Sequence, residues 1–445
     1  AAEASASTHI GHEGEAHPDS ASADTSQTRV TSDGWQVAAT HGPTDTLSFE
    51  TREATWTNVD VSPDGRRLVF DILGDLYELP MTGGVARRLT NDPAYDQQPR
   101  YSPDGTFILF TTDRGGSDNL WTLEIATGTL RPVTADAGHV INSGAWSPDG
   151  DYVVARKRIT DGSSLGTVEL WMYHRLGGSG LQVTKKDEVQ DTNGPVISPD
   201  GRWIYFAARH ARYQYNRNVY AGIWQIEGYD RETGVTRQFT DGYGGSARPA
   251  VSPDGKTLSF IRRDRTKTLL MLHDLASGEE RVLFEGLDPD MQENFAWTGS
   301  YPGYDWTPDG KEIVITYDGT LHAINVATGE ARDIPYTAQV DVAVRQTLRF
   351  QQDIGSETFR ARMLSWPTWA PSRQEFVFAA MGSLYRVPVG NGGAVSRIRT
   401  AGPRVYAPAL SRDGSRLAYV SWSDTDGGQV QVMPAAGGGS RAVTS

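Results

Sequence analysis

The stretch YSPDGTFILF occupies residues 101–110, and close copies of it recur along this chain of 445 residues. Pro presets the first central dihedral of a turn, Asp bonds to nearby backbone and Gly tolerates a positive φ, so Ser-Pro-Asp-Gly predicts a tight reversal. The residues that follow alternate in polarity with a period of two, which predicts a pleated strand. Copies begin at residues 61, 101, 146, 197, 251 and 306, and two worn copies begin at residues 370 and 410.

Two further strands follow in each copy. Third-strand segments include NLWTLEIATG from residue 119 and TLHAINVATG from residue 320, and most of them end in a Thr-Gly, Ser-Gly or Gly-Gly turn. Shorter fourth segments include LRPVT from residue 130 and TRQFT from residue 236. Four antiparallel strands per repeat make a β-propeller blade, which buries its faces on neighbouring blades. The sequence therefore predicts an all-β propeller of four-stranded blades that carry Ser-Pro-Asp-Gly repeats.

The number of blades in one ring is open to two interpretations. LSFETREATWTNVDVSPDG from residue 47 and LRFQQDIGSETFRARMLSWPTWAPS from residue 348 lead into similar blades, with six good repeats between them. This echo favours a six-bladed propeller over residues 41–340, with the first two blades of a second propeller over residues 341–445. The alternative is one eight-bladed ring.

The N-terminal segment differs in composition from the repeats. It opens with small residues, and its first 30 residues have almost no large apolar side chain. We therefore expect residues 1–40 to be a disordered leader that remains after signal-peptide cleavage. On this interpretation the protein is exported, to the periplasm or to the cell exterior.

Composition excludes several classes of function. The formal net charge is −13, so a basic surface for nucleic acid is not expected. The chain has no Cys, which rules out disulfides and thiolate metal sites. No apolar run approaches the roughly 18 residues that a membrane-spanning helix needs, so no membrane span is expected.

The repeats resemble those of the TolB-type propeller, whose blades carry Ser-Pro-Asp-Gly after the first strand, and the resemblance covers roughly residues 45–445. A narrower resemblance is carried by VDVSPDGRRLVFDILGDLYELPMTGGVARRLT from residue 59, QPRYSPDGTFILFTTDRGGSDNLW from residue 98 and the run from residue 273 to residue 315. These segments look like the propeller region that precedes the catalytic domain of exported amidohydrolase-family proteins.

The narrower resemblance implies an accessory role. In that family a metal-dependent barrel follows the propellers, and such a barrel needs a His-x-His pair and an Asp. None of the nine His residues here forms a His-x-His pair, so we expect no catalytic residue, metal site or cofactor within the chain. Zinc or another divalent metal is expected only in a missing catalytic domain. The expected partners are that C-terminal domain or other proteins, which the propeller would dock, gate or assemble.

Two other functions stay open. One is a TolB-like periplasmic scaffold that binds proteins, and the other is the propeller of a prolyl oligopeptidase-like peptidase. A Gly-x-Ser-x-Gly match lies at residues 162–166, but strands rather than a helix are expected to follow it. A nucleophile elbow needs a strand before the Ser and a helix after it. We therefore interpret the match as chance.

Two segments depart from the repeat pattern and supply the candidate interface or channel residues. The first, ARHARYQYNRNVYAG from residue 208, is an over-long loop with several basic and aromatic side chains. The second, GLDPDMQENFAWTGSYPGYDW from residue 286, joins two blades and could reach the central channel or a neighbouring domain. Such loops on a rigid scaffold commonly build contact surfaces. The candidates are Arg212, Tyr213 and Tyr215 in the first segment, and Asp288, Asp290, Glu293 and Trp297 in the second.

Overall fold

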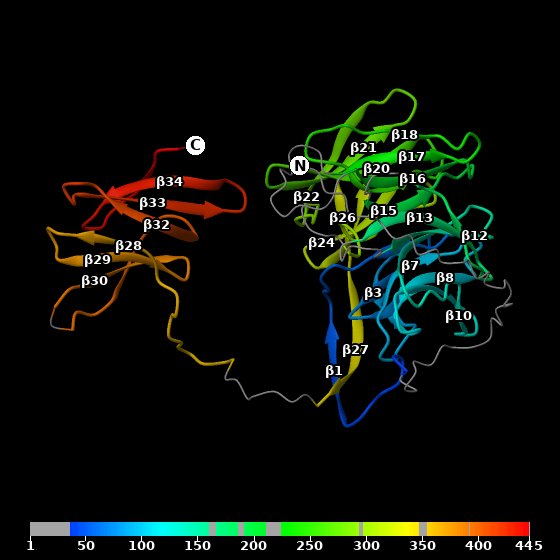
Figure 1. Cartoon of the computed structure of the whole chain (residues 1–445), viewed down its shortest axis with the longest axis horizontal. Coiled ribbons are helices and arrows are strands. Elements are labelled where there is room, and N and C mark those ends of the chain that lie inside the picture. The colour runs from blue at the N-terminus through cyan, green and yellow to red at the C-terminus, as the bar shows by residue number, and fades with distance from the viewer. Residues whose placement is uncertain are drawn as a thin grey trace, which may run out of the picture.

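The computed structural model describes residues 36–159, 166–185, 191–210, 224–292, 297–346, 354–390 and 392–444. Within these residues the regular secondary structure is entirely β-strand, with eight four-stranded sheets and one three-stranded sheet (Figure 1). Each four-stranded sheet is an antiparallel meander whose strands follow chain order, as in a propeller blade. The prediction of an all-β propeller is confirmed.

The first three blades follow one another along the chain. Blade 1 is formed by β2 (Val59–Val61), β3 (Arg67–Ile72), β4 (Asp75–Pro80) and β6 (Arg87–Arg88). Blade 2 is formed by β7 (Asp96–Tyr101), β8 (Phe107–Thr112), β9 (Asn119–Glu124) and β10 (Leu130–Pro132). Blade 3 is formed by β11 (Val140–Trp146), β12 (Tyr152–Ile159), β13 (Thr167–His174) and β14 (Leu181–Gln182).

The next three blades have the same strand order. Blade 4 is formed by β15 (Asp191–Ile197), β16 (Trp203–Arg209), β17 (Gln225–Asp230) and β18 (Thr236–Gln238). Blade 5 is formed by β19 (Ala247–Val251), β20 (Thr257–Asp264), β21 (Lys267–Asp274) and β22 (Glu280–Leu287). Blade 6 is formed by β23 (Asp305–Trp306), β24 (Glu312–Tyr317), β25 (Thr320–Asn325) and β26 (Ala331–Ile334).

Six hydrophobic clusters join these blades, one between each pair of neighbours. Side chains alternate between the two faces of a strand, so successive residues of one strand belong to different clusters. In β3, Leu68 and Phe70 pack on blade 6, whereas Val69 packs on blade 2. In β8, Ile108 packs on blade 1 and Leu109 packs on blade 3. Since the sixth cluster joins blade 6 to blade 1, the ring closes after six blades, and the eight-bladed alternative is wrong.

The repeated turns also contact one another around the ring. In blade 1 the hydroxyl of Ser62 donates to Asp64 Oδ1 (2.6 Å), and Gly65 has a φ of 70°. A Cβ added to Gly65 would lie 3.5 Å from Cδ of Pro308, the proline of the blade 6 turn. A Cβ on Gly105 of blade 2 would lie 3.7 Å from Cδ of Pro63. The Pro of one turn therefore packs beside the Gly of the next, and we call this side of the ring the turn face.

A strap completes the closure. β1 (Thr44–Thr51) pairs antiparallel with β27 (Tyr336–Arg345), which also pairs in parallel with β5 (Gly84–Val85) of the blade 1 connection. Figure 1 shows β1 and β27 side by side, extending away from the ring. β27 comes directly after blade 6, so this pairing ties the last blade to the first. β27 also runs across residue 340, where we had predicted a domain boundary.

Two further sheets follow the strap and share their own core. Blade 7 is formed by β28 (Ser365–Ala370), β29 (Glu375–Ala380), β30 (Ser383–Pro388) and β31 (Ser396–Ile398). Blade 8 is formed by β32 (Arg404–Leu410), β33 (Arg416–Ser423), β34 (Gly427–Pro434) and β35 (Arg441–Ala442). That these sheets open a second propeller stays a prediction, and most of the expected leader lies outside the described residues.

Candidate functional site

The inner strands of the ring share a distortion that shapes its central channel. The first strands of neighbouring blades contact one another all the way around, so they surround the axis. In blades 2 to 5 the first strand has a register shift, and the residue four positions before the turn Ser has a positive φ. A bulge of this kind re-aims a side chain out of the regular pleat. The residues at this position are Gln98 (57°), Ser143 (55°), Gly194 (55°) and Arg248 (54°).

Residues 297–304, which we call the channel segment, precede blade 6 and cross to the opposite side of the ring. The carbonyl oxygen of Trp297 accepts hydrogen bonds from Asn142 Nδ2 (3.2 Å) and Arg156 Nη1 of blade 3. Both donors lie at the end of blade 3 away from its Ser-Pro-Asp-Gly turn. The channel segment therefore enters the channel from the side of the ring that lies opposite the turn face. We call that side the loop face.

Blades 1 and 2 hold the channel segment further along. Gln98 Nε2 of blade 2 donates to the carbonyl oxygen of Thr298 (2.7 Å). The backbone N–H of Gly303 donates to Asn58 Oδ1 of blade 1 (2.7 Å), and Val59 N donates to the carbonyl oxygen of Gly303 (2.9 Å). These hydrogen bonds join residues that are 200 and 245 positions apart in the sequence. Because each bond depends on ring closure, the channel segment is part of the scaffold.

Arg248 of blade 5 lies against the channel segment and reaches across the axis. A Cβ on Gly303 would lie 2.5 Å from Arg248 Nη2 and 3.1 Å from Arg100 Nη2, which comes from blade 2 on the opposite side of the ring. Arg248 is 6% exposed. Burial, and then the positive charge of Arg100, lower the pKa of Arg248 to about 9. The group is therefore a cation at neutral pH in a place that disfavours cations.

Several buried polar atoms around the channel have no hydrogen-bond partner among the described residues. They belong to the first strands of blades 3 and 4 and to the residue that precedes Asn58. Unpaired buried polar atoms are costly, so each one marks a place where water or a ligand is expected. The atoms are Thr57 Oγ1, Asn142 Oδ1, Asn193 Oδ1 and Asn193 Nδ2.

Two carboxyl groups meet where blade 6 joins blade 1. Arg100 Nη1 donates to Asp60 Oδ1 (2.6 Å), and the backbone N–H of Tyr101 donates to Asp60 Oδ2 (2.7 Å). Burial, and then the negative charge of Asp60, raise the pKa of Asp305 to about 8. Burial also raises the pKa of Asp60, against the opposing effect of Arg100. Asp305 therefore holds a proton at neutral pH and hydrogen-bonds to Asp60.

The described acidic candidates from the sequence have structural contacts. Asp290 is 4% exposed and accepts hydrogen bonds from Arg263 (2.7 Å) and from the Thr268 hydroxyl (3.1 Å). Asp288 is exposed and accepts a bond from the backbone N–H of Asp318 (3.0 Å). Both side chains anchor the connection between blades 5 and 6.

Of the described candidates, Trp297 reaches the channel, through its carbonyl oxygen. Trp297 is 42% exposed, and the Arg158 guanidinium lies 4.3 Å from the centroid of its ring. The structure therefore does not bring Trp297 together with the two acidic candidates. The remaining candidates, Arg212, Tyr213, Tyr215 and Glu293, and residues 162–165 of the Gly-x-Ser-x-Gly match lie outside the described residues.

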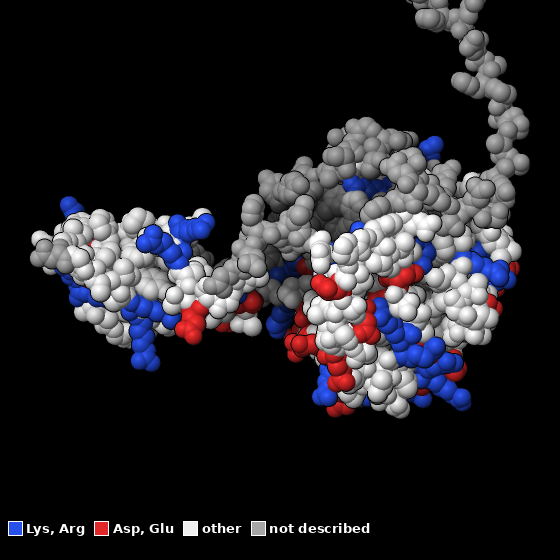
Figure 2. All heavy atoms as spheres, turned by 90° about the horizontal axis from the view of Figure 1, so that it is seen from below, with Lys and Arg blue, Asp and Glu red and all other residues white. Residues whose placement is uncertain are grey.

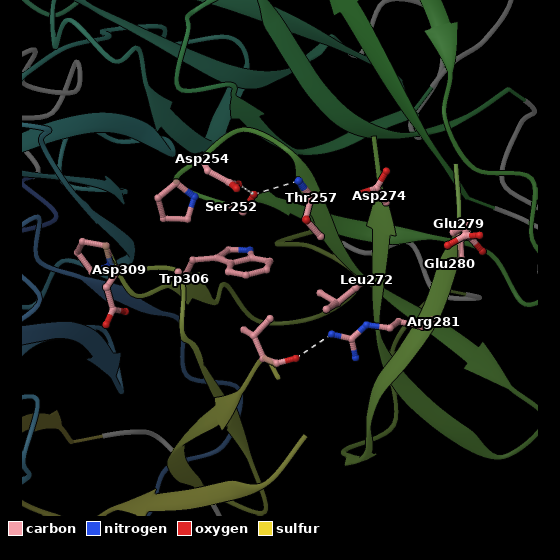
Figure 3. Close-up of a pocket in the computed structure, with 14 residues that line it drawn as sticks. Ser252, Asp254, Thr257, Leu272, Asp274, Glu279, Glu280, Arg281, Trp306 and Asp309 are labelled. Atoms are coloured by element: carbon pink, nitrogen blue, oxygen red, sulfur yellow. Dashed lines mark hydrogen bonds between the residues drawn. The ribbon is translucent and has the colours of Figure 1, made fainter. Parts of the chain in front are cut away.

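A groove of about 640 Å³ lies between blades 5 and 6 on the turn face (Figure 3). Trp306 forms part of its wall, and its indole N–H donates to Ser259 Oγ (2.9 Å). Asp254, Asp274, Glu280 and Asp309, four of the five acidic side chains of the groove, accept hydrogen bonds from protein groups. Asp254 accepts from Ser252 Oγ (2.6 Å), and although burial raises the pKa of Glu280, its contacts with His273 and Arg262 bring that pKa to about 2.

A second groove of about 310 Å³ lies at the equivalent place between blades 2 and 3. It is lined by Trp146 and by the same turn residues, Ser102, Pro103 and Asp104. Because the groove recurs with the repeat, it follows from blade packing. We therefore place the candidate site in the channel, where the blades differ from one another.

The six residues that stand four positions before the turn Ser or Thr could not be recognised as site residues from the sequence. The repeat aligns Asn58, Gln98, Ser143, Gly194, Arg248 and Gly303, each four residues before the turn Ser or Thr. The sequence does show that the residue type changes from blade to blade at this fixed position of the repeat. The meaning of that change depends on the bulge that turns the side chain inward, and that conformation is seen only in the structure.

Within the described residues no three His, Cys, Asp or Glu side chains lie close enough together to hold a metal ion. In the same part of the chain no helix is long and apolar enough to cross a membrane. In Figure 2, basic and acidic side chains are interspersed on the ring, whereas basic ones predominate on the smaller body that holds blades 7 and 8. That view contains no continuous basic surface of the kind that binds nucleic acid.

Comparisons with known proteins agree with the blade architecture. The TolB beta propeller domain model matches residues 54–220. An uncharacterized protein of Agrobacterium fabrum is 26% identical over 273 residues, which are 57% of this chain and 81% of that protein. A Tricorn-like protease C-terminal subunit of Sulfurisphaera tokodaii is 27% identical over 162 residues, 36% of this chain but 18% of that protein.

Among solved structures, TolB from Acinetobacter baumannii aligns with a TM-score of 0.47 and 16% identity over 64% of this chain and 65% of that one. The six closed blades show that the ring is a β-propeller, and its residues 54–220 are similar to the TolB beta propeller domain. This chain spans less than a fifth of the protease relative, and the activity of that relative belongs to that protein.

Proposed function

We propose that this chain is a non-catalytic docking module of an exported, metal-dependent amidohydrolase-family protein. The observation that carries the docking role is an exposed aromatic surface on blade 7. Trp369 and Phe376 are cross-strand partners, their ring centroids are 4.9 Å apart, and they are 41% and 40% exposed. Val377, the next residue on the strand, faces the core shared with blade 8.

A propeller blade normally buries both faces, as each blade of the ring does here. Blade 7 buries one face on blade 8 and leaves Trp369 and Phe376 on the other. Exposed aromatic clusters of this kind mark protein interaction surfaces. We propose that the C-terminal catalytic domain, or the blade that adjoins it, covers this surface.

On this proposal the chemistry belongs to the partner. The catalytic domain would hold zinc or another divalent metal and hydrolyse an amide-like bond with a metal-bound water. The ring would dock that domain, control access to it or assemble subunits. Export to the periplasm or the cell exterior belongs to the same proposal, supported by the composition of residues 1–40.

The first experiment compares the hydrolase activity of two proteins. The 445-residue chain and the product of the reading frame continued past Ser445 are each loaded with zinc and assayed against amide, ester and lactone substrates. We expect chelator-sensitive turnover in the longer protein alone. Chelator-sensitive turnover by the 445-residue chain would show that the chain itself is catalytic and would overturn the proposal.

A pair of variants then tests the docking surface. Replacing Trp369 and Phe376 by Lys should leave the thermal unfolding of the 445-residue chain nearly unchanged, because both side chains are already exposed. The same change should weaken binding of the separately expressed catalytic domain at least tenfold. Leu176→Lys, at a residue of the ring that is 71% exposed, is the control and should leave binding unchanged. Equal binding by both variants would contradict docking through blade 7.

A second candidate function rests on the family match. TolB-type propellers are periplasmic and bind proteins, so the ring could serve as a scaffold without a catalytic domain. A reading frame that ends at Ser445 would favour that scaffold. A serine hydrolase domain after Ser445 would instead favour the propeller of a prolyl oligopeptidase-like peptidase.

A further inference from the structure

The most unusual group in the ring is the guanidinium of Arg248. It is buried beside the axis, and no described carboxylate forms an ion pair or hydrogen bond with it. Two other arginines near the channel, Arg100 and Arg156, differ in this respect. Arg100 is paired with Asp60 at 2.6 Å, and Arg156 is paired with Asp191 at 3.2 Å. A buried cation without a paired anion is strongly disfavoured.

The carboxylate of Asp71 acts electrostatically on Arg248, but it already accepts hydrogen bonds from other groups. Asp71 is buried, and its Oδ1 accepts from the backbone N–H of Asn58 (2.8 Å). Its Oδ2 accepts from Asn58 Nδ2 (2.7 Å) and from the backbone N–H of Gln98 (2.8 Å). Asp71 therefore contributes a distant charge, and the donors of the Arg248 guanidinium stay available.

A second group without a partner lies beside Arg248. A Cβ on Gly299 would lie 3.7 Å from Arg248 Nη1 and 3.7 Å from Asn193 Oδ1. Asn193 is 2% exposed, and both polar atoms of its amide lack partners among the described residues. The Asn193 amide can donate two hydrogen bonds through Nδ2. The Arg248 fork and the Asn193 amide thus lie beside the same glycine of the channel segment, and a half-turn of the amide places Nδ2 where Oδ1 now lies.

Charge at this point also favours an anion. The guanidinium groups of Arg248 and Arg100 approach the same point on the channel segment, at Gly303, from opposite blades. Two cations this close repel each other, and one carboxylate, Asp60, pairs with Arg100. An additional anion would relieve the repulsion and use the donors of Arg248 and Asn193.

We propose that the central channel is a carboxylate-binding site, in which Arg248 and Asn193 hold the ligand beside the channel segment. The planar guanidinium matches the two oxygens of a carboxylate, and Asn193 Nδ2 supplies a further donor to one of them. The carboxylate belongs either to a small organic acid or to the C-terminus of a peptide. This site is separate from the docking surface on blade 7, so either proposal can fail without the other.

The experiment measures binding to the 445-residue chain by thermal shift and by calorimetry at constant ionic strength and pH 7. The probes are acetate, N-acetyl-triglycine with a free carboxylate and the same peptide as its C-terminal amide. We expect saturable stabilisation by acetate or by the free-acid peptide, with Tm rising by about 5 °C at a hundredfold excess over Kd. The amide should have no effect. Response to acetate indicates a small-acid site, and response to the peptide acid alone indicates a peptide terminus.

Two variants make the site assignment falsifiable. Arg248→Met should lose the response to every carboxylate probe. Asn193→Asp places a carboxylate of nearly the same shape beside Arg248, so it should raise the Tm without ligand and also abolish the response. Arg52→Met, at an exposed arginine of the strap region, is the control and should respond like the original chain.

Absence of saturable stabilisation by either carboxylate in the original chain would overturn the proposal. An unchanged response in Arg248→Met would do the same, because binding would then lie elsewhere. If Arg248→Met does not fold, Asn193→Asp decides: a variant that is no more stable than the original chain and still binds acetate or the peptide contradicts the site.

Discussion

In each turn of the ring, one hydroxyl makes two hydrogen bonds that fix the reversal. In blade 2 the Ser102 hydroxyl donates to Asp104 Oδ1 (2.6 Å) and accepts from the backbone N–H of Phe107 (2.8 Å). The bond from Ser102 is the main reason that the pKa of Asp104 is lowered. The same arrangement recurs in the other turns, with Thr307 in place of Ser in blade 6.

Removing this hydroxyl should destabilise a turn measurably. Ser102 is buried, so Ser102→Ala leaves the N–H of Phe107 without its partner and should lower the free energy of unfolding by about 1 kcal/mol. Urea unfolding measures the loss. Ser277→Ala removes a comparable hydroxyl from an exposed turn and should cost less than half as much. A cost for Ser102→Ala no larger than the control would show that the turn does not need the hydroxyl.

The Asp60–Asp305 pair makes stability depend on pH. The pKa of Asp305 is raised to about 8 in the folded chain, whereas an unfolded Asp has its ordinary value near 4. Between these values the folded chain holds a proton that the unfolded chain has released. This contribution to stability is therefore complete below about pH 4 and is lost as the pH rises through about 8.

Asp305→Asn should remove most of that dependence. The Asn amide still donates to Asp60 but does not ionise, so the variant should be more stable than the original chain at pH 9 by about 1–2 kcal/mol. Urea unfolding from pH 6 to pH 9 measures the difference. If both proteins lose stability equally over this range, the proton is not shared at this place.

Among the elements, the blades were predictable and the strap was not. The blade pattern is local: an apolar alternation, a turn with defined dihedrals and a second alternation lie within about 30 residues. The strap instead joins β1 to β27 and β27 to β5, over separations that no periodic pattern encodes. The channel segment was recognisable as an interruption of the repeat. Arg248 was not, because its role depends on a bulge and on ring closure.

A substitution at Gly83 tests whether the strap closes the ring. Gly83 has a φ of 83°, and a Cβ there would lie 2.3 Å from the carbonyl oxygen of Pro335, at the junction of β5 and β27. Gly83→Ala should therefore lower the free energy of unfolding by about 3 kcal/mol through backbone strain and loss of the parallel pairing. Urea unfolding again provides the measurement.

Gly278 is the matched control, since it has a φ of 77° and nothing lies within 4 Å of the position of its Cβ. Gly278→Ala should lower the free energy of unfolding by only about 1 kcal/mol, because Ala is disfavoured at a positive φ but meets no clash there. Equal destabilisation by the two variants would mean that the contact between Gly83 and Pro335 is unimportant for closure.

At the scale of the whole molecule, the ring and the pair formed by blades 7 and 8 have separate hydrophobic cores. The cluster at the centre of blades 7 and 8 contains no residue of the ring, and the ring is closed by its own strap. Cooperative unfolding follows shared burial, so cores that share no buried contacts should unfold independently. Ending the chain after residue 346 should therefore leave the thermal transition of the ring within about 2 °C of its position in the 445-residue chain.

The separated piece, residues 354–444, should behave differently. Its two blades leave Trp369 and Phe376 on an open sheet face, and two sheets bury far less apolar surface than a closed ring. We expect this piece to unfold at a lower temperature and to associate as its concentration rises, which calorimetry and sedimentation would detect. Loss of the ring transition when the chain ends after residue 346 would show that blades 7 and 8 belong to the same cooperative unit, and the separate-core interpretation would then be wrong.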